Sequence, residues 1–105
     1  MELLEIHRSE PATFALVGEL DMSSAKVLLS HLNDAPGDGD LVLELSALTF
    51  MDSSGLRAIM EVAQRRNGHS SVILRNATQS VSRVLEIALP GETPGVVVSP
   101  RGNGA

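Results

Sequence analysis

The residue types best suited to chemistry stand together in the stretch FMDSSGL, residues 50–56, where an acid and two hydroxyls follow an apolar run. A serine at a strand-to-helix turn, such as Ser53 or Ser54, can act as a nucleophile in hydrolases. The complete GxSxG pattern is absent here, however, and no histidine is placed to act as the base. We therefore expect no catalytic residue, and a protein that is not an enzyme.

Metal and cofactor chemistry also lacks its usual patterns. His7, His31 and His69 are far apart in the sequence and do not show the short spacings of metal sites. The chain has no cysteine, which excludes disulfides and thiolate ligands. Neither a GxGxxG after a strand nor a GxxxxGK phosphate loop occurs. We expect no metal site and no cofactor.

Composition and charge narrow the range of partners. The chain has 105 residues, enough for one domain with a single core. Its eight Lys and Arg residues are scattered, its formal charge is −5, and its only aromatic residues are Phe14 and Phe50. Nucleic acids require clustered cations and rings for stacking, so we expect no direct nucleic-acid partner. No apolar run approaches the roughly 20 residues that span a bilayer, so we expect no membrane insertion and a cytoplasmic location.

Hydrophobic spacing predicts the elements that must position the FMDSSGL stretch. Short apolar runs predict strands at residues 3–6, 13–17, 41–45, 72–74 and 96–98. The i, i+3, i+4, i+7 spacing predicts three amphipathic helices, with apolar faces of Ala25, Leu28, Leu29 and Leu32, of Leu56, Ile59, Met60 and Ala63, and of Val81, Val84, Leu85 and Ala88. Asn67-Gly68 and Pro90-Gly91 are expected to end the second and third helices.

The order of these elements predicts the fold class. The first two strands, separated by Pro11, suit a hairpin, and the strand-helix-strand units that follow favour parallel neighbours. We therefore predict an α/β protein with a mixed sheet of four to five strands and about three main helices packed on it. The domain should occupy residues 1–98, and residues 99–105 should form a flexible tail.

Acids and hydroxyls stand where the first two helices should begin. Asp21, Ser23 or Ser24 can accept hydrogen bonds from the free N–H groups of the first helix. Asp52 or Ser53 can do the same for the second helix. A cap of this kind stabilises a helix by about 1 kcal/mol, so capping alone accounts for these residue types.

Gly55 and its neighbours are less easily explained by capping. Glycine within the first turn of a helix costs about 1 kcal/mol relative to Ala, unless something must approach the backbone closely. A partner surface would be such a reason. Met22 and Leu56 could supply apolar contacts to a partner or belong to the core, whereas Phe50 and Met51 suggest the end of a buried segment.

FMDSSGL after a strand, together with GELD (residues 18–21) before the first helix, resembles the STAS domain of bacterial anti-sigma factor antagonists. The order of strands and helices agrees with that family from about Leu3 to Val98, so the resemblance covers nearly the whole chain. It implies a STAS-like single domain. Arg57 is a departure, because small residues are common at that position in the family.

The resemblance implies a protein that switches partners. In the family, the unphosphorylated protein binds an anti-sigma factor that is also a serine kinase, and the sigma factor is released. Phosphorylation abolishes this binding, and a serine phosphatase is a second expected partner. The phosphoacceptor carries over to Ser53. The partner surface carries over to Asp21, Met22, Ser23, Ser24, Asp52, Ser53, Ser54, Gly55, Leu56 and Arg57.

Two other functions are compatible with the same resemblance. Some compact STAS proteins are permanent subunits of lipid-transport ATPase complexes, in which the same surface docks on the ATPase and no phosphate is exchanged. Others are scaffolds of stress-signalling assemblies, although these often carry further domains or a threonine at the acceptor position. Serine stands at that position here, which favours the phosphorylated branch of the family.

Overall fold

Five strands and three helices form the protein in the computed structural model, which describes residues 4–66, 70–89 and 93–99. The strands are β1 (Leu4–Glu10), β2 (Thr13–Leu20), β3 (Leu41–Met51), β4 (Val72–Arg75) and β5 (Val96–Ser99), and the helices are α1 (Met22–Asn33), α2 (Ser53–Arg65) and α3 (Gln79–Ala88). All five strands belong to one sheet in the order β1-β2-β3-β4-β5.

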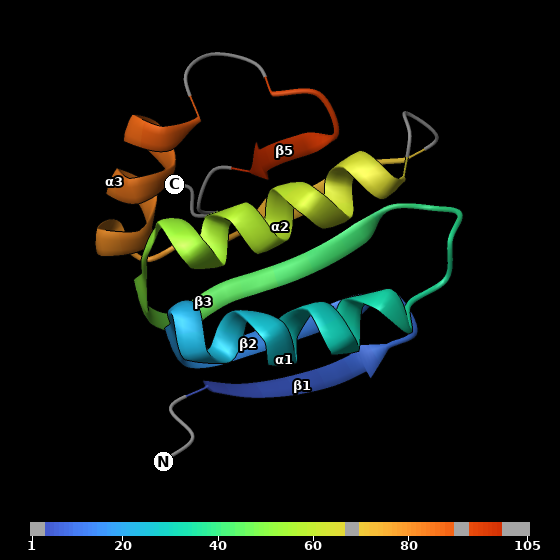
Figure 1. Cartoon of the computed structure of the whole chain (residues 1–105), viewed down its shortest axis with the longest axis horizontal. Helices are drawn as coiled ribbons and strands as arrows, with labels where there is room; N and C mark the ends of the chain where they lie inside the picture. The colour runs from blue at the N-terminus through green and yellow to red at the C-terminus, as the bar shows by residue number, and fades with distance from the viewer. Residues whose placement is uncertain (1–3, 67–69, 90–92, 100–105) are drawn as a thin grey trace.

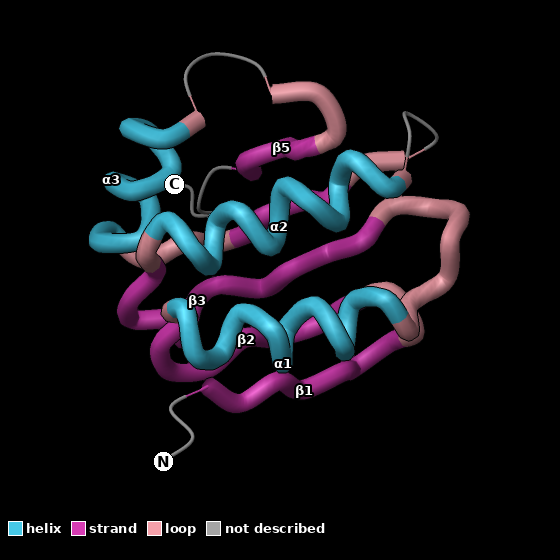
Figure 2. Tube along the Cα trace, in the orientation of Figure 1, coloured by secondary structure: helices cyan, strands magenta, loops and turns pink. Residues whose placement is uncertain are grey.

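The directions of the strands follow from their connections. β1 and β2 form an antiparallel hairpin, because only a short turn at Pro11 and Ala12 joins them. β2, β3, β4 and β5 run parallel, and a helix lies in the chain between each strand and the next (Figure 1; Figure 2). The predicted mixed α/β sheet with three helices is therefore confirmed.

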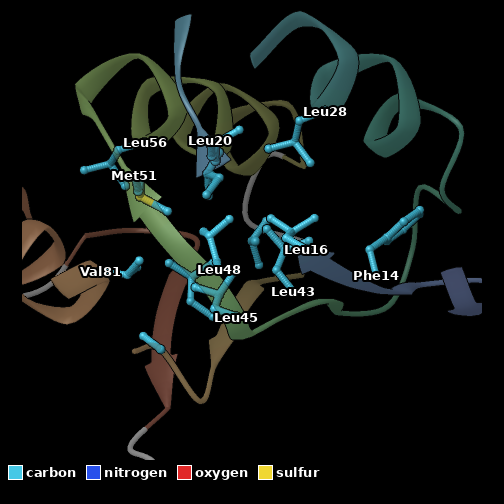
Figure 3. Close-up of a cluster of buried hydrophobic side chains, with 14 of the residues drawn as sticks. Phe14, Leu16, Leu20, Leu28, Leu43, Leu45, Leu48, Met51, Leu56 and Val81 are labelled. Atoms are coloured by element: carbon cyan, nitrogen blue, oxygen red, sulfur yellow. The ribbon is translucent and has the colours of Figure 1, made fainter. Parts of the chain in front are cut away.

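The core lies between the sheet and the helices. α1 and α2 lie side by side across one face of the sheet, and α3 packs against β3 near the start of α2 (Figure 1). Leucine supplies most of the buried side chains, as the near absence of aromatic residues requires. Figure 3 shows Leu28 entering this core from α1, Leu56 from α2 and Val81 from α3, while Leu20 enters it from the end of β2.

β3 has 11 residues, more than twice the length of the predicted strand at residues 41–45. The prediction was too short because the hydrophobic alternation is interrupted after residue 45. The register between β2 and β3 shifts between Ala15 and Val17, and again between Gly18 and Glu19, so that β3 holds an extra residue at each place. Such bulges turn the following side chains: Leu48 is buried although it breaks the alternation of Leu41, Leu43 and Leu45, and after the second bulge Met51 is buried in place of residues 47 and 49. Phe50, predicted to be buried, is 46% exposed.

Several predicted boundaries and faces need correction. Ala88, predicted to lie on the apolar face of α3, is exposed, whereas Met60 is partly buried and packs against the core. α2 ends at Arg65, with Arg66 as its C-cap. The predicted stop signals at 67–68 and 90–91 lie outside the described residues. Of the predicted tail, residue 99 is the last residue of β5 and the rest lies outside the described residues.

Candidate functional site

The starts of α1 and α2 lie together because β2 and β3 end together. Leu20 and Met51 are paired as the last residues of these parallel strands, and each is followed by an aspartate. The backbone N–H of Asp52 donates to the carbonyl of Leu20 at 3.1 Å, which ties the two ends. Both helices therefore begin at the same edge of the sheet (Figure 1), and this edge is the candidate site.

Asp21 caps α1 through a reciprocal set of hydrogen bonds. Its Oδ1 accepts from the backbone N–H groups of Ser23 at 3.0 Å and Ser24 at 3.1 Å. The Oγ of Ser24 in turn accepts from the backbone N–H of Asp21 at 3.0 Å, which completes a capping box. The side-chain hydrogen bond from Ser23, followed by the backbone N–H of Ser24, lowers the pKa of Asp21. Asp21 is therefore held as an anion at this edge.

Asp52 is the cap of α2. Its Oδ1 accepts from the N–H groups of Ser54 at 2.9 Å and Gly55 at 3.1 Å. Of the two capping residues that the sequence allowed, Asp52 takes the role, and Ser53 is the first residue of the helix proper. Ser53 is thus not required for the cap.

The Ser53 side chain is exposed at the first position of α2. Within the part of the chain that the structure describes, its hydroxyl makes no hydrogen bond. The neighbouring Ser23 differs, because its Oγ donates to Asp21 Oδ1 at 2.8 Å. Ser53 therefore presents a free hydroxyl on a backbone that Asp52 holds in place.

Gly55 and Leu56 face the core, which changes the interpretation of both. A Cβ on Gly55 would lie 2.5 Å from Cγ and 2.8 Å from Cδ2 of Leu20. The close approach that glycine permits is thus made by the protein's own core, and a partner is not needed to explain it. Leu56 is only 3% exposed, so its side chain belongs to the core and cannot anchor a partner.

The remaining predicted partner-binding residues divide by exposure. Met22 is 73% exposed and Ser23 and Arg57 are also exposed. Ser24 is buried at 4%, where its hydroxyl also donates to the carbonyl of Glu19, so its role is structural. Asp21, Asp52 and Ser54 are half-buried. A partner could contact the exposed and half-buried residues without a change in the fold.

A shallow groove of about 390 Å³ opens beside Ser53 between α2 and α3. It is lined by Ser53, Leu56, Arg57, Met60, Glu61, Gln64 and Ala88. Met60, Glu61, Gln64 and Ala88 are not among the residues predicted from the sequence to form the site. Helical spacing from Ser53 and Arg57 could have indicated the α2 residues, whereas Ala88 comes from another helix and carries no such signal.

Residues able to hold a metal do not cluster in the described structure. Within residues 4–66, 70–89 and 93–99, no group of three His, Asp or Glu side chains is arranged to hold a metal ion. Among the described helices, none is long and apolar enough to cross a membrane.

Comparisons with known proteins agree with the fold. A family model described as "Mlab, STAS domain" matches residues 5–89, which include all of the candidate site. The solved structure of the anti-sigma factor antagonist SpoIIAA in its unphosphorylated form is similar, with a TM-score of 0.68, 19% identity, and coverage of 92% of this chain and 88% of that chain. An anti-sigma factor antagonist from Mycobacterium paratuberculosis gives a TM-score of 0.65, 21% identity, and coverage of 90% and 83%.

No curated protein gives a match. At about 20% identity the two solved structures show that the fold is shared, and they do not by themselves assign a function. The family model, in contrast, extends over most of the chain and over every described element except β5 and the first residue of β1. This protein belongs to the STAS domain family.

Proposed function

We propose that this protein is an anti-sigma factor antagonist that acts by partner switching. In its unphosphorylated form it binds an anti-sigma factor with serine kinase activity, and the sigma factor is released. Phosphorylation of Ser53 by that kinase abolishes the binding, and a serine phosphatase restores it. The exposed Ser53 hydroxyl, free of hydrogen bonds to the described residues and placed at the first position of α2, carries this proposal.

The surroundings of Ser53 suit a residue that is modified without unfolding. A kinase needs an accessible hydroxyl, and the fold must tolerate a larger, charged group in its place. The cap is made by Asp52, and the first turn is held by the packing of Gly55 against Leu20 and by buried Leu56. None of these contacts uses the Ser53 side chain. The similarity to two solved anti-sigma factor antagonists also supports this function.

A phosphate would change the surface and leave the interior intact. It adds about −1.5 to −2 charges at neutral pH. Asp21 and Asp52 already stand at this edge of the sheet, so the added charge would give the whole edge a strongly negative field. A partner that docks closely here would meet both a larger side chain and a much more negative local charge, and binding would be lost without unfolding.

Affinity capture from the native cell, with the wild-type chain and two variants, tests this function. Wild type and Ser53→Ala should each retain a kinase-type anti-sigma factor, whereas Ser53→Asp should bind it at least tenfold more weakly. After incubation with ATP, mass spectrometry should place phosphate on Ser53 of wild type only. The Ala complex should then persist while the wild-type complex dissociates.

Folding controls keep the result specific. Ser53→Ala removes no capping hydrogen bond, so its free energy of unfolding should stay within about 0.5 kcal/mol of wild type. Ser30→Asp adds the same charge on α1 at an exposed serine outside the proposed surface, and it should bind like wild type. Equal binding by Ser53→Asp and wild type would contradict the proposal. Stable capture of a transporter ATPase with no phosphate on Ser53 would also contradict it, in favour of a transport-complex subunit.

A further inference from the structure

Arg57 is one helical turn beyond Ser53 and has no partner in the described part of the protein. Four other arginines are engaged: Arg8 with Asp34, Arg65 with Glu61, Arg75 with Glu44, and Arg66 with loop carbonyls. Arg57 is exposed and makes neither an ion pair nor a hydrogen bond to the described residues. Its guanidinium is therefore available to an anion that arrives on the same helix face.

Ser53 and Arg57 share that face. They are four residues apart on α2, and both line the groove between α2 and α3. Side chains at i and i+4 of a helix have Cβ atoms about 5–6 Å apart. An anion N-terminal to a cation at this spacing is the more favourable order of the two. The order here, with the acceptor serine first and the arginine second, is the favourable one.

Glu61, the other charged residue that lines the groove, already forms an ion pair. Glu61 is four residues beyond Arg57 and could pair with it, but its Oε2 lies 2.8 Å from Nη2 of Arg65. The backbone amides next to Ser53 are committed as well, because those of Ser54 and Gly55 donate to Asp52. The Arg57 guanidinium is therefore the cationic group of the groove that is available to a phosphate on Ser53. The N–H groups of Ser54 and Gly55 are not available, because they donate to Asp52.

We infer that Arg57 pairs in cis with the phosphate of phosphorylated Ser53, and that before phosphorylation the same guanidinium is free to meet a carboxylate of the partner. The inference rests on the proposed function and makes Arg57 a specificity-determining residue. Phosphorylation then has two effects: it adds negative charge, and it pairs with the Arg57 guanidinium that would otherwise bind a carboxylate of the partner. The net charge of the Ser53 and Arg57 pair changes from about +1 to between about −0.5 and −1.

The pairing can be tested on the full chain with phosphoserine incorporated at position 53 during translation, which needs no kinase. Phosphorus NMR over a pH titration measures the second pKa of the phosphate. In Arg57→Gln this pKa should rise by roughly 0.3 of a pH unit or more relative to wild type, because an ion pair of this spacing is lost. Arg57→Lys should restore most of the difference.

A matched control removes the same charge elsewhere. Lys26 occupies the corresponding position of α1, four residues after its first residue, and it is exposed and unpaired among the described residues. Lys26→Gln should leave the phosphate pKa unchanged. Asp52 is present in every variant, so its effect on the phosphate pKa is the same in all of them. An equal phosphate pKa in wild type and Arg57→Gln, or an equal rise in Lys26→Gln, would overturn the inference.

Binding measurements separate this inference from the proposed function. In the unphosphorylated state, Arg57→Gln should weaken binding to the kinase-type partner severalfold, and Arg57→Lys should bind more tightly than Arg57→Gln. If Ser53 controls binding but the phosphate pKa does not depend on Arg57, the proposed ion pair between Arg57 and the phosphate is wrong, and the proposed partner switching is still supported. If the pKa depends on Arg57 but the partner never phosphorylates Ser53, the pairing stands and the proposed function fails.

Discussion

At the scale of the residue, Gly55 shows how a position that suggests a partner can be required by the core. Glycine in a first helical turn is unfavourable by about 1 kcal/mol relative to Ala. Here the side chain of Leu20, itself fully buried, lies where a Cβ would be. Since Leu20 ends β2 and Gly55 lies in the first turn of α2, the glycine sets how closely the helix approaches the strand. The partner surface is left to the exposed neighbours Ser53 and Arg57.

Gly55→Ala should therefore destabilise the protein, although Ala is the better helix former. The added methyl group would lie 2.5 Å from Leu20 Cγ, and relieving that overlap in a packed core costs about 1 to 3 kcal/mol. Urea unfolding followed by circular dichroism measures the change. Gly37→Ala is the control, because nothing lies within 4 Å of its Cβ position. A Gly55→Ala protein more stable than wild type would refute the packing explanation.

At the scale of the element, α2 positions more than the candidate site. Its N-terminal cap places Ser53, and its C-cap residue Arg66 anchors the loop that leads into β3. The Nη2 of Arg66 donates to the carbonyls of Pro36 and Gly39, each at 2.8 Å, and its Nε donates to Ser70 Oγ at 2.9 Å. Arg66 is only 8% exposed. The Arg66 side chain therefore provides hydrogen bonds to two backbone carbonyls of the loop at residues 34–40.

Arg66→Met should loosen that loop. The methionine retains much of the apolar stem but none of the donors, so we expect a loss of about 1 to 3 kcal/mol in the free energy of unfolding. Limited proteolysis within residues 34–40 should become faster. Arg65→Met is the matched control, because its ion pair with Glu61 is exposed and should contribute at most about 0.5 kcal/mol. Equal effects of the two substitutions would show that Arg66 does not anchor the loop.

At the scale of the whole molecule, carboxylates held as anions make the fold sensitive to acid. Burial raises the pKa of Glu44, but hydrogen bonds from Arg75, Ser46 and Asn76 outweigh it, and the net pKa is lowered. The pKa of Asp21 is lowered by its hydrogen bonds as well. A lowered folded-state pKa means that the unfolded chain binds protons first as the pH falls. The stabilisation is therefore present above the unfolded pKa values and is lost below them.

The free energy of unfolding should accordingly decrease as the pH falls below about 4.5, the ordinary value for Glu. Glu44→Gln should be less stable than wild type at pH 7 by about 1 to 2 kcal/mol, because it loses charged hydrogen bonds to Arg75 and Asn76. It should also lose less stability between pH 5 and about pH 3. Urea unfolding at several pH values measures both effects.

Glu86→Gln removes the same charge from the exposed side of α3 and serves as the control. Its stability at pH 7 should be within about 0.5 kcal/mol of wild type. A pH dependence of Glu44→Gln that parallels wild type would show that Glu44 does not contribute to acid sensitivity.

The sequence by itself determined the order and type of the elements, because the hydrophobic spacing of each segment is a local property. It also placed Asp21 and Asp52 at helix starts, since capping involves residues two or three positions apart. From the resemblance it further placed Ser53 at the expected acceptor position. The length of β3 was missed because two bulges interrupt the alternation on which a strand prediction depends.

Only the tertiary structure decided which residues of the candidate site face outward. Gly55, Leu56 and Ser24 are adjacent in sequence to exposed residues, yet packing between β2, α1 and α2 buries all three. The groove beside Ser53 likewise needs Ala88 from α3. Among the residues that the structure describes, Arg57 has no ion-pair partner, and Glu61 pairs with Arg65. Burial and the groove depend on segments far apart in the chain, so no local pattern can predict them.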